Sequence, residues 1–260
     1  MIALIAGTGS LPRLIAQAWD HDLLVCELEG IVSEVPAHLP KLQFRIETIG
    51  SFLEELKRRG ATKICMAGAI LRPQVDPAKI DEKTLPLVPR IQAAISKGDD
   101  GALREVIAIL EDAGFEVIGA TDLLPSLLPA VGCPTQTKPE TELALQTVRD
   151  AFTTMSARDV GQSCIVKDGH IIALEGQDGT AAMIEAFGTA GAILFKGPKR
   201  AQELRADMPV IGPDTVKQIR AKNMAGIVIA YRGVMVLELQ EVISALDAAD
   251  AFLWIGEGFL

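Results

Sequence analysis

The chain has 260 residues, enough for one large domain or two small ones. Hydrophobic residues make up 49% of it, which is sufficient for a packed core and argues against a disordered protein. The net charge of −9 argues against a protein that binds nucleic acid over a broad face, because such proteins are usually basic. Any cationic binding is therefore expected at a local site.

The cysteines and the N-terminus both indicate a cytoplasmic protein. None of Cys26, Cys65, Cys133 and Cys164 has C-x-x-C spacing, so we expect free thiols in a reducing compartment. The N-terminal stretch MIALIAGTGSLP lacks a basic region and reaches glycine after six residues, which predicts a strand rather than a signal peptide. No apolar run reaches the ~18 residues of a membrane span, so any contact with a membrane would be at its surface.

The first half of the chain alternates short apolar runs with helical patterns. Strands are predicted at residues 2–6, 23–26, 44–48, 63–67 and 115–119. Helices are predicted from Pro12 onward and at residues 52–59, 84–97 and 101–113. This alternation is typical of a parallel, doubly wound sheet. We therefore expect a Rossmann-like α/β domain over residues 1–130.

The second half follows a predicted linker at residues 131–140, which are rich in Pro, Gly and Thr. Residues 141–260 then predict a second, mixed α/β domain. Hairpins are predicted at residues 163–173 and 226–238, the latter turning at Arg232-Gly233. Helices are predicted at residues 141–156, from Gly179-Thr180 onward and, after an Asp214-Thr215 cap, through Ala221. Strands are predicted at residues 192–196 and 252–255.

A glycine-rich turn, Gly7-x-Gly9, follows the first predicted strand. A dinucleotide fingerprint needs a third glycine where this chain has Pro12, so a nicotinamide or flavin cofactor is disfavoured. Such a turn before a helix can still hold a phosphate or hydroxyl group on the free amides of the helix N-terminus. The alternative is a tight turn without a ligand, and the sequence leaves both open.

Three further polar motifs stand beside predicted elements. Lys97-Gly98-Asp99-Asp100 lies between two helices, where Asp99 or Asp100 is expected as an N-cap; two adjacent carboxylates can instead ligate a metal or a ribose. Asp159-Val160-Gly161-Gln162 precedes the first hairpin, and Glu175 follows it, before Gly179-Thr180. Polar groups at strand ends are typical of α/β sites, but they also occur as ordinary loop residues.

The most informative stretch is FKGPKRAQELRADMPVIGPDT, residues 195–215. It gathers Lys196, Lys199, Arg200, Arg205 and Asp207 just after an apolar strand. Lysines as point charges and an arginine as a fork suit a diphosphate. An aspartate beside them suits Mg²⁺ binding or water activation. The alternative is a solvated connector, which composition alone favours.

The same stretch resembles the signature of the LpxI family, the UDP-2,3-diacylglucosamine pyrophosphatases of lipid A synthesis. The matching residues are Lys196, Lys199, Gln202, Glu203, Arg205, Asp207, Pro209, Ile211, Gly212 and Thr215. Further matches follow in the order of the family: Ile5-Ala6-Gly7-x-Gly9-x-Leu11-Pro12, Ala67-Gly68 with Arg72-Pro73, Lys97-Gly98-Asp99-Asp100, Asp159-x-Gly161-Gln162, and Glu175 with Gly179-Thr180. Each motif is weak alone, but their order over nearly the whole chain is specific.

The resemblance implies two α/β domains with ligand between them. It also implies Mg²⁺-dependent hydrolysis of UDP-2,3-diacylglucosamine to UMP and 2,3-diacylglucosamine 1-phosphate (lipid X), with water attacking the phosphorus on the sugar side. The implied catalytic residues are Asp207, Lys196 and Lys199. Asp207 is also the implied metal ligand, with Asp178 as a second candidate; whether Asp207 is a ligand or a base stays open. The implied substrate-binding residues are Gly7, Gly9, Ser10, Leu11, Pro12, Gly68, Arg72, Asp99, Asp100, Gln162, Glu175, Thr180, Gln202, Arg205 and Thr215.

One departure from the family concerns Ala181. The family usually has Gly-Thr-Asp where this chain has Gly179-Thr180-Ala181, so a plausible metal or sugar contact lacks its carboxylate. Asp178, two residues before Thr180, is the candidate substitute.

Two other functions compete with hydrolysis. A non-catalytic protein that binds a nucleotide sugar or a phospholipid would use the same cationic segment, and a nucleotide-dependent oxidoreductase would use Gly7-x-Gly9. The chemistry favours hydrolysis, because cations and Mg²⁺ beside a diphosphate stabilise the charge that develops in the transition state. Nucleic acid is not expected as a partner, and the sequence leaves open whether the chain forms a homodimer.

Overall fold

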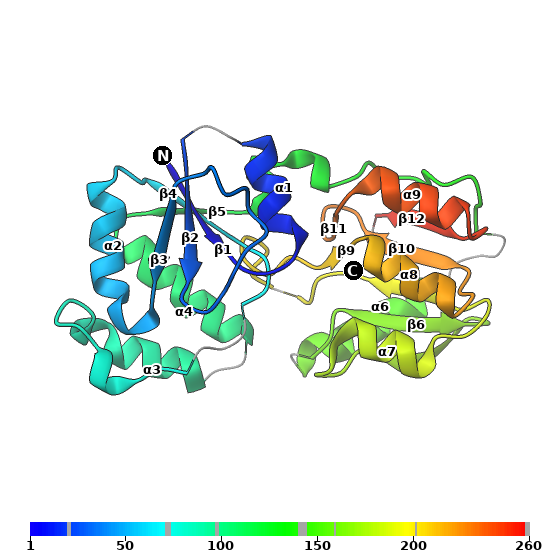
Figure 1. Cartoon of the computed structure of the whole chain (residues 1–260). Helices are drawn as coiled ribbons and strands as arrows, with labels where there is room; N and C mark the ends of the chain where they lie inside the picture. The colour runs from blue at the N-terminus through cyan, green and yellow to red at the C-terminus, as the bar shows by residue number, and fades with distance from the viewer. Residues whose placement is uncertain are drawn as a thin grey trace. The chain divides into compact units, whose positions relative to one another are not determined.

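The computed structural model describes residues 1–19, 22–70, 74–96, 99–139, 145–158, 160–200 and 202–257 (Figure 1). The chain divides into two compact units. Unit 1 contains Met1–Pro125 with Arg205–Asp207, and unit 2 contains Ser126–Leu204 with Met208–Leu260. Both units are α/β, as predicted. Three residues of the 195–215 segment therefore belong to unit 1, although the sequence on either side of them belongs to unit 2.

Unit 1 contains a five-stranded sheet in the order β3-β2-β1-β4-β5, and all its neighbouring strands are parallel. The strands are β1 (Ile2–Ala6), β2 (Leu23–Leu28), β3 (Lys41–Phe44), β4 (Lys63–Ala67) and β5 (Glu116–Ile118). Every residue of β1 and β2 is buried, as expected for central strands of a parallel sheet with helices on both faces. The predicted doubly wound sheet is therefore confirmed.

The helices predicted in unit 1 are at the predicted places, with shifted ends, and one predicted strand is displaced. The helices of this unit are α1 (Ser10–Ala18), α2 (Ile49–Arg58), α3 (Val88–Ser96), α4 (Asp99–Asp112) and α5 (Ala120–Leu123). The helix predicted from residue 84 begins at Val88, after a 3-10 turn at Leu85–Leu87, so that Pro89 falls in the first turn, where proline is tolerated. The strand predicted at residues 44–48 lies instead at Lys41–Phe44, and Ile46–Thr48 forms a 3-10 turn.

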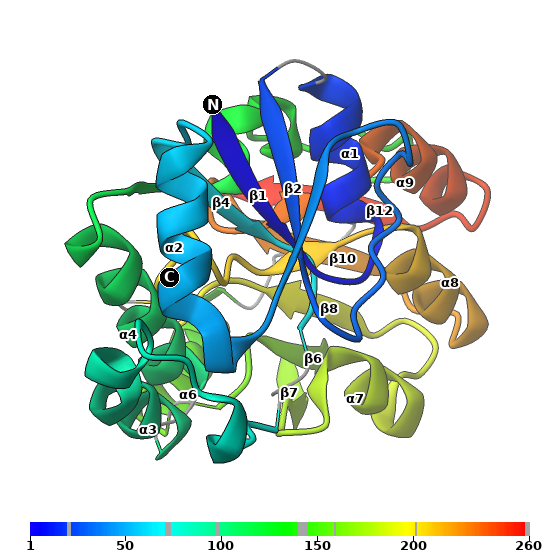
Figure 2. The same cartoon turned by 60° about the vertical axis from the view of Figure 1, so that its left-hand side comes forward.

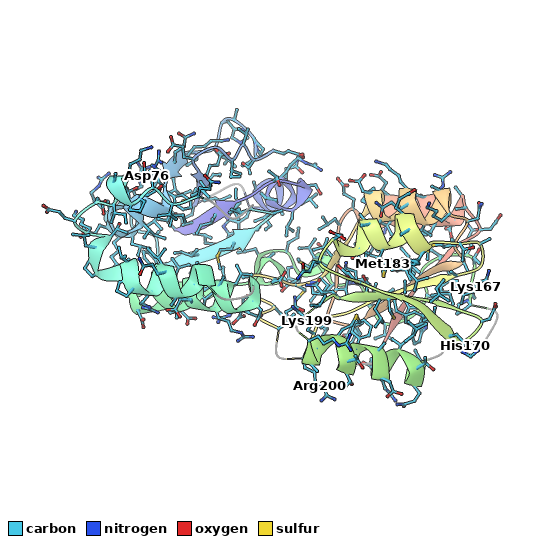
Figure 3. The ribbon with its side chains drawn as sticks, turned by 90° about the horizontal axis from the view of Figure 1, so that it is seen from below. Asp76, Lys167, His170, Met183, Lys199 and Arg200 are labelled. Atoms are coloured by element: carbon cyan, nitrogen blue, oxygen red, sulfur yellow. The ribbon has the colours of Figure 1, made fainter. Side chains whose placement is uncertain are left out.

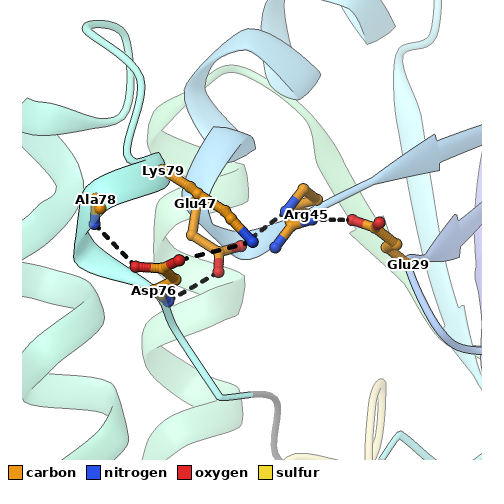
Figure 4. Close-up of polar contacts among 6 residues, drawn as sticks. All are labelled: Glu29, Arg45, Glu47, Asp76, Ala78 and Lys79. Carbon is orange, nitrogen blue, oxygen red and sulfur yellow. Dashed lines mark hydrogen bonds and ion pairs between the residues drawn. The ribbon is translucent and has the colours of Figure 1, made fainter.

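The departure after Phe44 has a polar cause, shown in Figure 4. Glu47 is buried and accepts hydrogen bonds from Arg45 Nε at 3.4 Å and from the backbone N–H of Asp76 at 2.9 Å. Arg45 also pairs with Glu29. Burial raises the pKa of Glu47, but the backbone and Arg45 hydrogen bonds outweigh this effect and lower it. The carboxylate therefore ties the chain at Asp76 to the start of α2.

Unit 2 contains a five-stranded mixed sheet in the order β12-β10-β8-β6-β7. Its strands are β6 (Ser163–Lys167), β7 (His170–Leu174), β8 (Ile193–Lys196), β10 (Gly226–Ala230) and β12 (Phe252–Gly256). Strands β8, β10 and β12 are parallel, and β6 is antiparallel to both β8 and β7. The predicted β6–β7 hairpin is confirmed; it turns at Asp168 and Gly169, which both have positive φ, as a two-residue hairpin turn requires.

The second predicted hairpin, at residues 226–238, is wrong. Strand β10 instead lies between β8 and β12 and is parallel to both. Every residue of β10 is buried, which is typical of a central parallel strand rather than of a half-exposed hairpin. The chain then reaches β11 (Met235–Val236), which pairs in parallel with β9 (Val210–Ile211) as a separate two-stranded sheet.

The helices of unit 2 cover both faces of its sheet. They are α6 (Leu145–Ala157), α7 (Gly179–Phe187), α8 (Pro213–Ala221) and α9 (Leu239–Asp247). Figures 1 and 3 show α7 and α6 on opposite sides of the β6–β7 hairpin, and α8 packs against both α7 and α9. The N-cap of α8 is Gly212 rather than Asp214 or Thr215, although the predicted Thr215 contributes to the cap by accepting from the N–H of Gly212. Pro213 is the first residue of the helix, a position where proline loses no hydrogen bond.

Residues 131–139, predicted as part of a linker, are held by unit 2. Gly132 and Ile255 exchange backbone hydrogen bonds of 3.0 and 2.8 Å at the edge of β12. The buried hydroxyl of Thr135 accepts from the backbone N–H of Leu253 at 3.0 Å, and the N–H of Gln136 donates to Asp247 Oδ1 at 2.7 Å. These bonds add the segment to the edge of the unit 2 sheet.

The thiols agree with the expectation from the sequence. All four cysteines are free, and Cys26, Cys65 and Cys164 are buried. Burial raises the pKa of each of these three thiols to about 12, so they are inert at neutral pH. In the parts of the chain that the structure describes, no helix has the length and apolarity needed to cross a membrane.

Glu27, in β2, carries a buried carboxylate that accepts several hydrogen bonds. Glu27 is only 5% exposed. Its Oε1 atom accepts hydrogen bonds from the N–H of Ser33 at 3.2 Å, from Ser33 Oγ at 2.5 Å and from Lys41 Nζ at 2.9 Å. Burial raises the pKa of Glu27, but the hydrogen bonds from Ser33 and Lys41 outweigh this effect and lower it. The charged form therefore stabilises unit 1.

We predict that Glu27→Gln lowers the free energy of unfolding by about 1–3 kcal/mol at pH 7, because Ser33 and Lys41 lose a charged acceptor. Since the folded-state pKa is lowered, the contribution of Glu27 is complete above its unfolded pKa of ~4.3 and is lost as the pH falls through the folded pKa. Urea unfolding of the wild-type chain and of Glu27→Gln at pH 7 and pH 3 measures this contribution to the free energy of unfolding.

The matched control for this measurement is Glu116→Gln, which removes a carboxylate that is 60% exposed and paired with Lys63. Its effect should stay below about 1 kcal/mol, because exposed ion pairs contribute little. Equal losses for Glu27→Gln at the two pH values would contradict the role assigned to its charge.

Candidate functional site

The first group of predicted residues lies at the carboxyl ends of β1 and β4 in unit 1. The chain leaves β1 toward β2 on one side, while β4 lies on the other side, and ligands of such sheets bind where the strand order reverses. Here Gly7 N donates to Ala67 O at 2.8 Å, and Thr8 and Ala69 form an antiparallel bridge. The two loops that follow these strands are therefore joined.

Glycine is required on both sides of this junction. A Cβ atom on Gly7 would lie 2.4 Å from the carbonyl oxygen of Ala69, and one on Gly68 would lie 2.6 Å from that of Thr8. Gly68 also has a φ of +84°, which side-chain-bearing residues rarely adopt. The glycines of the two motifs thus permit a close backbone approach.

Helix α1 begins at this junction. Gly9, with a φ of +92°, is its N-cap, Ser10 is its first residue, and the side chains of Leu11 and Pro12 are buried. The structure thus brings together six of the predicted binding residues, Gly7, Gly9, Ser10, Leu11, Pro12 and Gly68, and what they offer to a ligand is mainly backbone amides at a helix N-terminus. Arg72 lies outside the described residues.

The aspartates of the 97–100 motif belong to α4. This helix begins at Asp99, so the N-cap predicted at Asp99 or Asp100 is wrong and both residues lie in the first turn. Asp100 Oδ2 accepts from Arg104 Nε at 2.7 Å, one turn further along. A carboxylate in this position also interacts favourably with the helix dipole. Lys97 and Gly98 lie outside the described residues.

A second group of polar side chains gathers at the carboxyl end of β8 in unit 2. We call it the relay cluster, and it consists of Ser163, Glu175, Thr180 and Lys196. Lys196 ends β8, and Ser163 begins β6 directly opposite it in the antiparallel pair. Glu175 follows β7, and Thr180 is the second residue of α7. Four elements therefore contribute one side chain each.

The members of the relay cluster are hydrogen-bonded in sequence. Lys196 Nζ donates to Thr180 Oγ1 at 2.6 Å, the hydroxyls of Thr180 and Ser163 are 3.0 Å apart, and Ser163 Oγ donates to Glu175 Oε2. The backbone N–H of Gln162 donates to the same Oε2 at 3.0 Å. Ser163 is 0% exposed and Lys196 is 7% exposed, so a lysine charge is held almost entirely inside the protein.

Gly161 and Gln162 hold the strand ends of the relay cluster together. A Cβ atom on Gly161, whose φ is +78°, would lie 2.4 Å from the carbonyl oxygen of Glu175. Gln162 O accepts from the N–H of Gly197 at 2.9 Å, which joins this loop to the end of β8. Asp159, from the same motif, lies outside the described residues.

Sequence reasoning anticipated most of the relay cluster. Glu175, Thr180 and Lys196 were predicted as site residues, and the structure brings them together, with the predicted Gln162 beside them. Ser163 was missed. The signal that could have revealed it is a single serine at the head of an otherwise apolar strand, where a buried hydroxyl needs a partner.

The turn after Lys196 is held by its own side chains. Lys199 N donates to the side-chain oxygen of the buried Gln202 at 2.9 Å, and Arg200 N donates to Ser156 Oγ of α6 at 2.9 Å. Figure 3 shows Lys199 and Arg200 at the end of unit 2 opposite to the hairpin turn. A segment fastened in this way is not a solvated connector.

The end of the same segment is fastened to unit 1. Arg205 donates to Glu111 Oε1 at 2.6 Å and to the carbonyl oxygen of Val117 in β5 at 3.4 Å. Ala206 packs against the core of unit 1, and Asp207 belongs to the same unit. Arg205, predicted to bind substrate, therefore anchors the peptide that carries Asp207. Thr215 lies in the first turn of α8, where its hydroxyl accepts from Gly212 N at 3.4 Å.

The predicted metal ligands are single carboxylates rather than a cage. Within the described residues, no three His, Cys, Asp or Glu side chains form a group that could hold a metal ion. Asp178 is exposed just before α7, and Ala181 is exposed in the first turn of that helix. Such positions fit Mg²⁺ only in the common arrangement in which substrate phosphates and water supply most of the oxygens and one or two carboxylates supply the rest.

We predict that Gly161→Ala is strongly destabilising and inactivating, because its Cβ would collide with the backbone of Glu175 and displace that carboxylate. The matched control is Gly169→Ala in the hairpin turn. Gly169 has nearly the same φ, +77°, but a Cβ there would meet nothing within 4 Å. Thermal unfolding should show a clearly larger loss for Gly161→Ala, by about 1–3 kcal/mol. Equal losses of stability in the two variants would mean that the positive φ alone, and not the collision with Glu175, causes the effect.

Comparison with known proteins places both halves of the chain. Residues 1–127 match the LpxI N-terminal domain, and residues 130–254 match the LpxI C-terminal domain. The chain is also 30% identical over 268 aligned residues to the UDP-2,3-diacylglucosamine pyrophosphatase LpxI of Caulobacter vibrioides, an alignment that covers 97% of this chain and 96% of that protein. The resemblance found in the sequence motifs is confirmed, and the chain belongs to the LpxI family.

Proposed function

We propose that this protein is a UDP-2,3-diacylglucosamine pyrophosphatase of lipid A biosynthesis, which hydrolyses its substrate to UMP and 2,3-diacylglucosamine 1-phosphate. The observation that carries the proposal is the similarity over both domains to a C. vibrioides protein named for this activity. Water supplies the oxygen that forms the new P–O bond, and the bond between that phosphorus and the bridging oxygen breaks as UMP leaves.

The relay cluster and the turn after it support this chemistry. Lys196 is the last residue of β8, and Lys199 lies in the turn that follows it. This is the end at which parallel strands of α/β proteins present their ligand-binding groups. A diphosphate is anionic, and hydrolysis adds charge to the attacked phosphoryl group and to the leaving group. The ammonium group of Lys196, which is held in a nearly water-free position, stabilises that charge more than a mobile surface lysine does.

Mg²⁺ is part of the proposal. Asp207 and Asp178 are the carboxylates proposed to hold the ion, together with phosphate oxygens of the substrate. A bound Mg²⁺ would neutralise charge on the diphosphate and orient its oxygens. Cytoplasmic location, a homodimer and a peripheral contact with the inner membrane stay predictions.

The decisive experiment measures UMP release from UDP-2,3-diacylglucosamine by the purified chain, with Mg²⁺ and with EDTA. Release that requires Mg²⁺ supports the proposal. Binding of the substrate without any release of UMP would instead identify a non-catalytic nucleotide-sugar-binding protein. UMP release that is unaffected by EDTA would support the hydrolase function but contradict the requirement for Mg²⁺.

We predict that Asp207→Ala lowers kcat by at least about 100-fold and changes KM much less, because a group that acts mainly in the transition state contributes little to ground-state binding. Steady-state kinetics of UMP release measure both constants. The control is Asp214→Ala, which removes a carboxylate of the same segment that is 93% exposed and paired only locally with Lys217. Near-normal turnover in Asp207→Ala would end its catalytic role.

We predict that Ala181→Asp raises the apparent Mg²⁺ affinity or the turnover, because a carboxylate in the first turn of α7 is favoured by the helix dipole and stands where the family usually has one. Mg²⁺ titration of the initial rate compares the variant with the parent chain. Ala182→Asp is the control, since it adds the same charge at the next exposed position of the helix. An unchanged or weakened Mg²⁺ dependence would show that no ligand is missing, as expected if Asp178 already serves.

A further inference from the structure

The numbers of donors and acceptors in the relay cluster allow only one direction for its hydrogen bonds. A lysine ammonium has three donors and no acceptor, so Thr180 Oγ1 must accept the bond from Lys196 Nζ. A carboxylate only accepts, so Ser163 must donate its single proton to Glu175 Oε2. Ser163 therefore has only lone pairs to offer Thr180, and the Thr180 hydroxyl is the donor in the 3.0 Å bond between them.

The result is a directional chain from Lys196 through Thr180 and Ser163 to Glu175. Its two ends carry opposite charges, and two neutral hydroxyls join them. Bonds in such a chain polarise one another, so a carboxylate at one end strengthens the donor–acceptor contact at the other. A charged lysine as deeply buried as Lys196 needs compensation of this kind.

The surroundings restrict the Ser163 hydroxyl to this task. Ser163 is 0% exposed, so it has no surface on which to meet a substrate. It faces Lys196 across the β6–β8 pair, where opposite side chains lie about 4.5–5.5 Å apart at Cβ. The N–H of Gln162 fixes the same Glu175 oxygen that Ser163 reaches. The Glu175 end of the chain is thereby held by the backbone.

We propose that Ser163, Thr180 and Glu175 are positioning residues that orient the charged ammonium of Lys196 toward the diphosphate. This inference rests on the hydrolase function proposed above. Neither Ser163 nor Glu175 then needs to touch substrate, and Lys196 is the group through which all three act. Each contributes to the rate by holding a charge in place before the reaction begins.

The test compares Thr180→Val, which keeps the shape but removes the hydroxyl, with Thr180→Ser, which keeps the hydroxyl. Thr180→Val, Ser163→Ala and Glu175→Gln should each lower kcat by about 10- to 100-fold and change KM by less than about 3-fold. Thr180→Ser should retain most of the wild-type kcat. Thermal unfolding of each variant separates loss of fold from loss of rate.

A double variant tests whether the residues act as one chain. Because either change alone interrupts the relay, Ser163→Ala with Thr180→Val should be no slower than the slower single variant. Multiplied effects, or a wild-type kcat in Thr180→Val, would overturn the proposal. If Ser163→Ala fails to fold, the Thr180→Val and Thr180→Ser pair decides, since Thr180 is only half-buried.

A second readout does not depend on activity. In ¹⁵N NMR of lysine side chains, the ammonium of Lys196, identified by its loss in Lys196→Arg, should give a slowly exchanging signal. Thr180→Val and Ser163→Ala should shift or broaden that signal, and Thr180→Ser should preserve it. A wild-type chain that releases no UMP would end the proposed function, while a signal unaffected by Thr180→Val would end the relay.

Discussion

Parallel strand pairing is the constraint on which both candidate regions depend. In a parallel sheet the carboxyl ends of neighbouring strands meet at one edge, so loops that are distant in sequence become neighbours. In unit 1 this brings the Gly7 and Gly68 loops together, and in unit 2 it places Lys196 at the edge shared by β8, β10 and β12. The antiparallel strand β6 then runs back so that Ser163 begins where β8 ends.

Close contacts between backbone segments hold the loops at these sheet edges in place. Gly7 and Gly68 let two loops of unit 1 approach at distances that a Cβ atom would forbid, and Gly161 does the same beside Glu175 in unit 2. Gly7, Gly68 and Gly161, one glycine from each of three family motifs, therefore have one physical role, which is to remove a side chain where two chain segments meet. The polar residues next to them are held by short hydrogen bonds as a consequence.

The 195–215 segment combines three different tasks that its sequence does not distinguish. Lys196 is buried in the relay cluster, Gln202 fastens a turn through Lys199, and Arg205 anchors the peptide of Asp207 to Glu111 of unit 1. The cations look alike in sequence, but Lys196 is a buried charge, Lys199 lies in a turn and Arg205 forms a structural ion pair. The buried lysine has the water-excluded environment in which a fixed charge acts most strongly.

The sequence by itself determined the elements whose signals are local. The apolar runs separated by helical periods predicted the parallel sheet of unit 1, and the pattern at residues 163–173 predicted the first hairpin; ordered motifs identified the family. Only the tertiary structure decided that β10 is a central parallel strand, that Ser163 joins Lys196 to Glu175, and that Arg205 belongs to unit 1. Each of these depends on a partner that lies a dozen or more residues away, and a short apolar run, a serine or an arginine looks the same in sequence whichever partner it finds.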